Sequence, residues 1–336
     1  MKSTAFSLLL VIALSVLVGC GKDKTESEEL TSSPPGAGPE GKREGVRPKG
    51  TIALSVLTLT NPFFITIADT MKAEAQKHGY EVVVTSGEFD VARQQNQVKD
   101  FIVSRVAAIV LCPCDSKAIG PVIREANEAG IPVFTADIAC LAPGAKVVSH
   151  VATDNYGGGK LAADALVEAI GGKGKVAIID HPVVESVILR TKGFHERLAE
   201  LNKKPEIDVR VVAQLPGGGV RDRSFQTAQD ILQAHSDLAG IFAINDPSAL
   251  GARAALEKAG KADQIVIVGF DGQPEGKQAI KEGKICADPI QFPDQIAIKT
   301  VQTIVRYFRG EEVPAEILIP TALYRKKDAE KDPALK

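Results

Sequence analysis

Short apolar runs alternate with longer amphipathic segments from residue 51 onward. Most of the runs are too continuously apolar for a sheet that faces water on one side. This pattern is typical of parallel strands that helices cover on both faces. We expect strands at residues 52–57, 81–85, 107–111, 132–136, 147–151, 175–179, 208–213, 240–244 and 264–269.

Helix-capping residues stand at the ends of the segments between these runs. Asn61 and Pro62 suit the N-cap and the first helical position, and Gly79, Gly130 and Gly260 suit the residue after a C-cap. The repetition of strand and helix predicts an α/β fold with doubly wound parallel sheets. Because the 336 residues exceed the roughly 250 to 300 at which a single core stops growing, we expect two lobes.

The N-terminus carries the features of an export signal. Lys2 precedes an apolar run at residues 6–18, and Leu17-Val18-Gly19-Cys20 resembles the lipobox of bacterial lipoprotein signal peptides. The alternative is a short membrane anchor, but the run is below the roughly 20 residues needed to span a bilayer. We therefore expect a lipoprotein signal peptide at residues 1–20, lipidation of Cys20, and an extracytoplasmic protein anchored in the periplasm or on the outer face of the cell membrane.

Composition narrows the class of ligand. Residues 21–48 are polar and rich in Pro, Gly, Glu and Lys, which predicts a disordered tether. The whole chain has 40 basic and 42 acidic residues and a net charge of −2, so it has no basic field for nucleic acid. We expect contact with a membrane only through the lipid anchor, and a small neutral molecule as the ligand.

The cysteines do not form a metal-binding motif. Cys112 and Cys114 lack the two-residue gap of a zinc or thioredoxin-type site. The sequence leaves two alternatives open. Cys114 and Cys140 form a disulfide, or the cysteines, including Cys286, are free thiols. The sequence also has no G-x-S-x-G elbow and no phosphate-binding G-x-x-x-x-G-K loop. We expect no metal, no cofactor and no enzymatic activity.

Polar side chains follow several of the predicted strands. Ligands of doubly wound sheets bind outside the carboxyl ends of the strands. Asn61, Asp137, Asp180, Asn245, Asp246 and Asp271 occupy such positions. Singly, Asp180 and Asp246 are interpreted as helix caps. Together with the neighbouring aromatic rings of Phe63 and Phe64, the set is typical of a polyol site, because hydroxyls need acceptors and donors and a sugar ring needs an apolar wall.

Five motifs in order resemble the ribose-binding-protein branch of bacterial sugar-binding proteins, the substrate-binding components of sugar ABC transporters. The motifs are Asn61-Pro62-Phe63-Phe64, Asp154-Asn155-Tyr156-Gly157-Gly158, Ala243-Ile244-Asn245-Asp246, Val268-Gly269-Phe270-Asp271-Gly272 and Gln291-Phe292-Pro293-Asp294-Gln295. The resemblance covers residues 51–324 and implies two lobes joined by three chain crossings near Ala152, Ile290 and Pro320. It implies an N-terminal lobe of residues 49–152 plus 291–320, a C-terminal lobe of residues 153–290 plus 321–327, and a tail at residues 328–336.

The resemblance also implies a set of ligand-binding residues. These are Asn61, Phe63, Phe64, Asp137, Arg190, Asn245, Asp271 and Gln291. Taken alone, Arg190 is typical of a solvated helix face. Because Gly193 and Phe194 match the family motif that follows this arginine, we interpret it as a ligand contact.

Departures from the family pattern bear on which sugar binds. Leu57, Cys112 and Ile138 replace a Ser, an Asn and an Arg of the ribose binders. The position at which those proteins carry an aromatic ring in the far lobe falls near Gly219 of this chain. A site without those polar partners should not favour ribose. A deoxy-sugar, a cyclitol or a bulkier pentose or hexose suits it better. His181 is either a further ligand contact or a loop histidine.

The functional expectation is a monomeric solute-binding protein. It would close its hinged lobes around a monosaccharide or related polyol and deliver the ligand to an ABC transporter permease. The alternative is a sugar-sensing receptor that signals to a chemoreceptor or sensor kinase. A sugar-responsive repressor shares such lobes, but it would need an N-terminal helix-turn-helix in place of the lipobox and tether.

Overall fold

The computed structural model describes residues 49–335. The signal peptide, the lipidation site Cys20 and the tether predicted for residues 1–48 lie outside this range. Within residues 49–335, no helix combines the length and the apolar character needed to cross a membrane.

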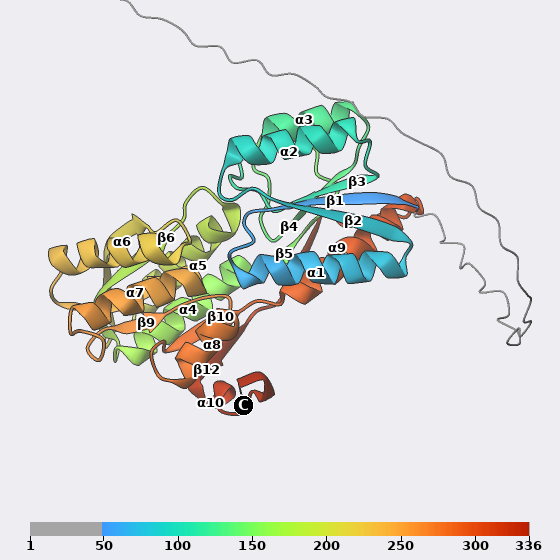
Figure 1. Ribbon diagram of the computed structural model, residues 1–336. Helices are drawn as coiled ribbons and strands as arrows, with labels where there is room; N and C mark the ends of the chain where they lie inside the picture. The colour runs from blue at the N-terminus through green and yellow to red at the C-terminus, as the bar shows by residue number, and fades with distance from the viewer. Residues whose placement is uncertain (1–48, 336) are drawn as a thin grey trace, which may run out of the picture. The chain divides into compact units, whose positions relative to one another are not determined.

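Two six-stranded sheets form the framework of the described chain (Figure 1). Sheet A has the strand order β11-β5-β4-β3-β1-β2 and is entirely parallel. Its strands are β1 (Gly50–Val56), β2 (Tyr80–Ser86), β3 (Ala108–Leu111), β4 (Val133–Ala136), β5 (His150–Thr153) and β11 (Glu316–Ile319). Sheet B has the order β12-β10-β9-β8-β6-β7, and only its β10–β12 pair is antiparallel. Its strands are β6 (Lys173–Asp180), β7 (Asp208–Pro216), β8 (Leu238–Ala243), β9 (Val266–Val268), β10 (Ala287–Ile290) and β12 (Ala322–Arg325).

Helices cover both faces of each sheet. The first lobe consists of sheet A with α1 (Pro62–Lys77), α2 (Val91–Val103), α3 (Gly120–Glu128) and α9 (Pro293–Phe308). In Figure 1, α2 and α3 lie on one side of this sheet and α1 and α9 on the other. The second lobe consists of sheet B with α4 (Asn155–Ala169), α5 (Glu185–Leu201), α6 (Arg221–Ala234), α7 (Asp246–Lys258), α8 (Pro274–Lys281), α10 (Lys326–Ala329) and the 3₁₀ turn Pro333–Leu335.

Burial along the strands agrees with this layering. All residues of β3, β4 and β5 are buried. In β6, Val176 and Ile178 belong to a different apolar cluster from Ala177 and Ile179, since successive side chains of a strand point to opposite faces. The predicted doubly wound parallel fold is confirmed.

The chain passes between the lobes three times. It leaves sheet A after β5 and enters α4, leaves sheet B after β10 and enters α9, and returns from β11 to β12. These crossings coincide with the predicted ones near Ala152, Ile290 and Pro320. The exact residue boundaries of the lobes stay predictions. In the segment predicted as a tail, Asp332 accepts a hydrogen bond from the Tyr324 hydroxyl at 2.9 Å, and the Leu335 carbonyl accepts one from Lys281 Nζ at 2.6 Å.

The predicted elements match the observed ones with three omissions. Each of the predicted strands overlaps an observed strand, whereas β10, β11 and β12 were not predicted. Asn61 caps α1 and Pro62 occupies its first turn, as predicted. Gly79, Gly130 and Gly260 follow C-caps in left-handed conformations with φ of 81°, 75° and 66°. The four cysteines of the described chain are free thiols.

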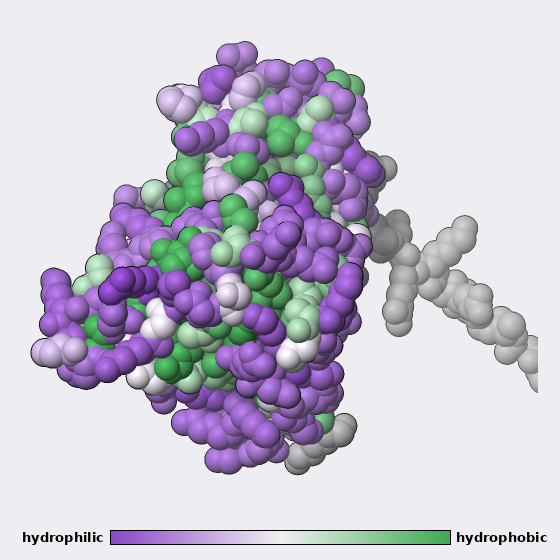
Figure 2. Space-filling view, turned by 90° about the vertical axis from the view of Figure 1, so that its left-hand side faces the viewer, coloured by the Kyte–Doolittle hydropathy of each residue, from purple (hydrophilic) through white to green (hydrophobic). Residues whose placement is uncertain are grey.

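The surface is mainly hydrophilic. On the face shown in Figure 2, apolar residues gather in the middle of the view among hydrophilic surroundings. Large apolar residues that stay exposed in the described chain include Leu59 and Ile65 near the start of α1, and Leu141, Val183 and Ile188.

Candidate functional site

A cavity lies between the carboxyl ends of the strands of the two sheets. It encloses about 40 Å³ of free space, so it is narrow. All eight predicted ligand-binding residues line it: Asn61, Phe63, Phe64, Asp137, Arg190, Asn245, Asp271 and Gln291. Leu57, Ile138 and His181 line it as well. Cys112 does not; it is fully buried, and its carbonyl accepts a hydrogen bond from Gln94.

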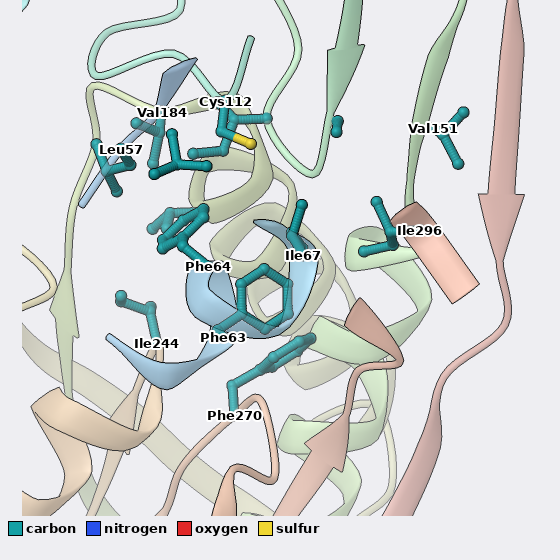
Figure 3. Packing of buried hydrophobic residues seen from close by; sticks show 14 of the residues in the cluster. Leu57, Phe63, Phe64, Ile67, Cys112, Val151, Val184, Ile244, Phe270 and Ile296 are labelled. Carbon is teal, nitrogen blue, oxygen red and sulfur yellow. The ribbon is translucent and has the colours of Figure 1, made fainter. Parts of the chain in front are cut away.

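The start of α1 supplies an aromatic wall. Asn61 Oδ1 accepts a hydrogen bond from the Phe63 N–H at 3.0 Å, and this cap fixes the direction in which the helix leaves the strand. The rings of Phe63 and Phe64 are buried and meet edge to face, with centroids 5.2 Å apart. In Figure 3 the Phe64 ring lies between Leu57 of its own lobe and Ile244 of the second lobe, and the Phe63 ring lies above that of Phe270. They offer the apolar surface that the C–H face of a sugar ring needs.

Asp137 follows β4 and projects a carboxyl group into the cavity. Its φ of 65° lies in the left-handed region, which is uncommon outside glycine but which Asp adopts more readily than most residues. Its N–H donates to the Val151 carbonyl at 2.8 Å, which holds the backbone in place. Burial raises the pKa of Asp137 to about 7, although the Arg190 charge opposes the rise. Oδ1 of Asp137 is buried and has no hydrogen-bond partner among the described residues.

Arg190 is held rigidly from several directions. Its Nε donates to Asn155 Oδ1 at 2.8 Å, and its Nη1 donates to the Ile244 carbonyl at 2.6 Å and to Asp271 Oδ1 at 3.2 Å. The face of the guanidinium rests on the Phe270 ring. Nη2 has no protein partner in residues 49–335, so one edge of the fork stays available to a ligand.

The position of Arg190 depends on two glycines where α4 and α5 cross. A Cβ on Gly159 would lie 2.0 Å from the Arg190 carbonyl oxygen, and a Cβ on Gly193 would lie 2.1 Å from the Tyr156 carbonyl oxygen. Only glycine permits this approach of the two backbones. Gly193 was noted in the sequence as part of the family motif, and the structure gives its physical role.

Asp271 joins the second lobe to the hinge. Its φ is 98°, and its Oδ1 accepts a hydrogen bond from Gln291 Nε2 at 2.6 Å as well as the one from Arg190. Burial raises the pKa of Asp271 to about 6, and the Arg190 charge and the Gln291 hydrogen bond oppose the rise. Gln291 Oε1 is buried without a hydrogen-bond partner in the described chain. Asp137 and Gln291 therefore both present unpaired acceptors at this cavity.

Asn245 shapes the cavity through contacts within its own lobe. Its Oδ1 caps α7 by accepting from the Ser248 N–H at 2.9 Å, and its Nδ2 donates to the Gly219 carbonyl at 3.0 Å. Gly219 lines the cavity without a side chain, at the position where the ribose binders are expected to place an aromatic ring. The cavity wall at Gly219 therefore lacks the aromatic ring expected there in the ribose binders.

His181 of the second lobe and Phe89 of the first lobe meet at the cavity. Their ring centroids are 6.2 Å apart, with an edge-to-face geometry. Burial lowers the pKa of His181 to about 4, and the Arg223 charge adds to this, so the ring is neutral near pH 7. Its Nε2 is buried and has no hydrogen-bond partner in residues 49–335. Phe89 was missed in the sequence, although it follows the end of β2 and the strand-end rule applies to it.

Two predicted helix caps were wrong. Asp180 is the last residue of β6, and no helix follows it directly, because α5 begins at Glu185. Asp180 instead accepts a hydrogen bond from Gln214 at 2.6 Å. Asp246 is the first residue of α7, whose N-cap is Asn245, and its Oδ2 accepts from the Gln273 N–H at 2.6 Å.

A buried pair of acids lies behind the site. Asp288 is fully buried on β10, and its carboxyl group faces that of Asp246. Burial raises the pKa of Asp288 to about 7 and raises that of the neighbouring Asp246 well above its usual range, to which the charge of Asp288 contributes. We expect the pair to retain a proton at neutral pH. In the described chain no cluster of three His, Cys, Asp or Glu side chains is arranged to hold a metal ion.

The sequence matches the family described as periplasmic binding protein domain over residues 52–312. The chain belongs to the periplasmic binding protein family. Family membership implies an extracytoplasmic location and confirms a substrate-binding protein rather than an enzyme.

Individual members of this family support the predicted ribose-binding-like branch. The chain is 38% identical over 280 residues to the ribose import binding protein of Escherichia coli K12, which covers 83% of this chain and 92% of that protein. It is 32% identical over 283 residues to the D-apiose import binding protein of Paraburkholderia graminis, covering 83% and 88%. A solute-binding protein from Actinobacillus succinogenes, solved with bound D-allose, superposes with a TM-score of 0.77 and 29% identity, covering 84% of this chain and all of that one.

Proposed function

We propose that this chain is a sugar-binding lipoprotein that closes around a monosaccharide or related polyol and delivers it to an ABC permease. The observation that carries the proposal is one narrow cavity, lined by both lobes, in which buried acceptors of Asp137 and Gln291 lack partners beside the phenyl rings of Phe63 and Phe64. Leaving such acceptors unpaired costs about 1 to 3 kcal/mol each, and sugar hydroxyls supply the missing donors. Relatives named for ribose and apiose import support this class of ligand.

The residues that line the cavity favour a sugar that carries fewer hydroxyl groups on one of its sides. Leu57 and Ile138 are buried and apolar at the cavity, and neither can satisfy a hydroxyl. Gly219 leaves room where a ring would otherwise restrict the ligand. A deoxy-sugar, a cyclitol or a bulkier pentose or hexose therefore suits the site better than ribose. His181 Nε2 would add one hydrogen bond to such a ligand.

Capture involves a change in the distance between the lobes. Asp137 belongs to the first lobe and Arg190 to the second, and only closed lobes present both to one ligand. The monomeric protein would act outside the membrane, tethered through residues 21–48 to a lipid on Cys20.

A thermal-shift screen tests the ligand class. The panel contains D-ribose, D-apiose, D-allose, D-fucose and myo-inositol, with amino acids as the negative set. A ligand at a hundredfold excess over its Kd stabilises the folded state by about 2.7 kcal/mol, which is easily measured. We expect a cyclitol, a deoxy-sugar, a hexose or a pentose bulkier than ribose to give the largest shift. Ribose as the strongest ligand would contradict the interpretation of Leu57 and Ile138, and stabilisation by amino acids alone would overturn the sugar assignment.

Small-angle scattering tests closure with the sugar that gives the largest shift. The radius of gyration should fall when that sugar is added. A tight complex with an unchanged radius would show that the lobes do not move on binding.

A further inference from the structure

Helix α5 begins without a capping side chain of its own. Its N-cap, Val184, has extended backbone angles of −113° and 136°, and its side chain carries no oxygen that can accept from the first turn. The first N–H groups of a helix have no intrahelical partner and need an external acceptor. An uncapped start would leave the Glu185 N–H unpaired.

The first lobe supplies the missing acceptor. The Glu185 N–H donates to Ser116 Oγ at 2.9 Å, and the Ser116 N–H donates to the Val183 carbonyl at 3.0 Å. Ser116 lies between β3 and α3 and is completely buried. Its own carbonyl accepts from the Leu141 N–H at 2.6 Å, which ties the residue to its lobe. Two hydrogen bonds of one serine thus cross from the first lobe to the start of α5.

The capped helix carries groups that line the ligand cavity. Ser186, Val187 and Arg190 all lie in the first two turns of α5 and reach the cavity. The N-cap residue Val184 is itself 2% exposed and packs in the cluster that contains Leu57. In Figure 3, Val184 lies beside Leu57 and Cys112 of the first lobe. Ser116 does not line the cavity, so its contacts act on the helix and not on the ligand.

We infer that Ser116 is a positioning residue: it caps α5 across the lobe boundary and so stabilises the closed arrangement that holds Arg190 at the ligand. The inference rests on the proposed sugar-binding function. A contact made only when the lobes are together favours the closed state, and the affinity for any ligand of that state rises with its population. Closure of the lobes therefore caps the start of α5 and also assembles the binding site.

The test compares Ser116→Ala with Ser116→Thr and a matched control. The control is Ser149→Ala, because Ser149 is also fully buried in the first lobe but its hydroxyl has no hydrogen-bond partner in the described chain. Each variant is titrated calorimetrically with D-ribose, D-apiose, D-allose, D-fucose and myo-inositol. Loss of a helix cap predicts about fivefold weaker binding for Ser116→Ala. Ser116→Thr keeps a capping hydroxyl and should restore affinity, and Ser149→Ala should leave it unchanged.

Amide hydrogen exchange provides a second measurement, made on the protein saturated with a sugar that binds, because the bound sugar holds the lobes together. The segment at residues 183–190 should exchange faster in Ser116→Ala than in wild type or Ser149→Ala. Wild-type affinity and wild-type exchange in Ser116→Ala would overturn the inference, as would an equal loss of affinity in Ser149→Ala. If none of the five sugars binds, the proposed function fails. Faster exchange of residues 183–190 in Ser116→Ala than in Ser149→Ala would then still show that Ser116 caps α5 in molecules whose lobes are together, and equal exchange would overturn the inference.

Discussion

The guanidinium carbon of Arg190 lies 3.8 Å from the centroid of the Phe270 ring, so a buried cation rests on an aromatic face at the wall of the cavity. The same guanidinium forms hydrogen bonds with Asn155, Ile244 and Asp271. Stacking fixes the plane of the group, and the hydrogen bonds fix its rotation within that plane. The unpaired edge is therefore presented to the ligand in one orientation.

Arg190→Ala should weaken sugar binding by well over tenfold, because truncating a buried charged group costs roughly 2 to 5 kcal/mol. Arg190→Lys should also lose about tenfold or more, since an ammonium has no planar fork to satisfy the three oxygens at once. Titration calorimetry measures both. Arg197→Ala on the same helix is the control, because Arg197 pairs with Asp164 at the surface. Normal binding by Arg190→Lys would show that the fork geometry is not required.

The two aspartates Asp180 and Asp271 should behave oppositely when each is changed to Ala. Asp271 contacts Arg190 and Gln291 at the cavity, so its loss should weaken binding by more than about tenfold. Asp180 does not line the cavity and accepts from Gln214, so its loss should cost about 1 kcal/mol of folding stability and leave affinity unchanged. Calorimetric titration and thermal unfolding separate the two effects. The reverse pattern would place the binding site elsewhere.

Asp288→Asn should stabilise the protein at alkaline pH. A carboxyl group whose pKa rises from 3.8 to about 7 on folding holds its proton more tightly in the folded state, so its contribution to the free energy of unfolding falls as pH rises through that window. The buried His150 and His181, with pKa values lowered to about 4, act in the opposite direction between about pH 4 and 6.5. The substitution removes the Asp288 contribution together with the part of the rise in the Asp246 pKa that the charge of Asp288 causes.

The melting temperature of Asp288→Asn, measured against pH, should exceed that of wild type at pH 8 and converge with it at pH 4. Each kcal/mol corresponds to roughly 2 to 4 °C in a domain of about 150 to 250 residues, and to no more than that in this larger chain. Asp230→Asn, at an exposed position on α6, is the control. An equal shift at both pH values would mean that the effect is packing and not ionisation.

Cys20→Ser should release the protein from the membrane fraction or leave its leader uncleaved, because the thiol is the proposed lipid attachment point. Cell fractionation and the mass of the mature chain measure this. Sugar affinity of the purified lobes should be unchanged. Continued membrane association with normal leader cleavage would exclude lipidation at this residue.

The sequence predicted those strands whose apolar pattern lies within the strand itself. The continuous apolar runs of β3, β4 and β8 were visible because both faces of these strands are covered. By contrast, β10 contains Asp288 and Pro289, which interrupt the apolar run, and β11 alternates exposed and half-buried residues at a sheet edge. Neither pattern indicates a buried parallel strand.

Contacts between distant segments were not predictable in the same way. Nothing near Asp246 in the sequence shows that its carboxylate accepts from the Gln273 N–H at the start of another helix. Likewise, the sequence around Ser116 does not reveal that it lies against α5. Residues that follow strand ends were found together, because the geometry of a parallel sheet gathers them without any knowledge of the partner segment.

Because β11 and β12 come last in the chain, both sheets are completed only at the end of synthesis. Sheet A lacks its edge strand until residues 316–319 are made, and sheet B lacks one until residues 322–325 follow. Helix α9, which packs on α1, β4 and β5, also comes late in the chain. A polypeptide interrupted after β10 would leave apolar surface of the first lobe uncovered and prone to aggregation. Neither half can finish folding during synthesis until the last strands have emerged, so the two lobes become complete almost together.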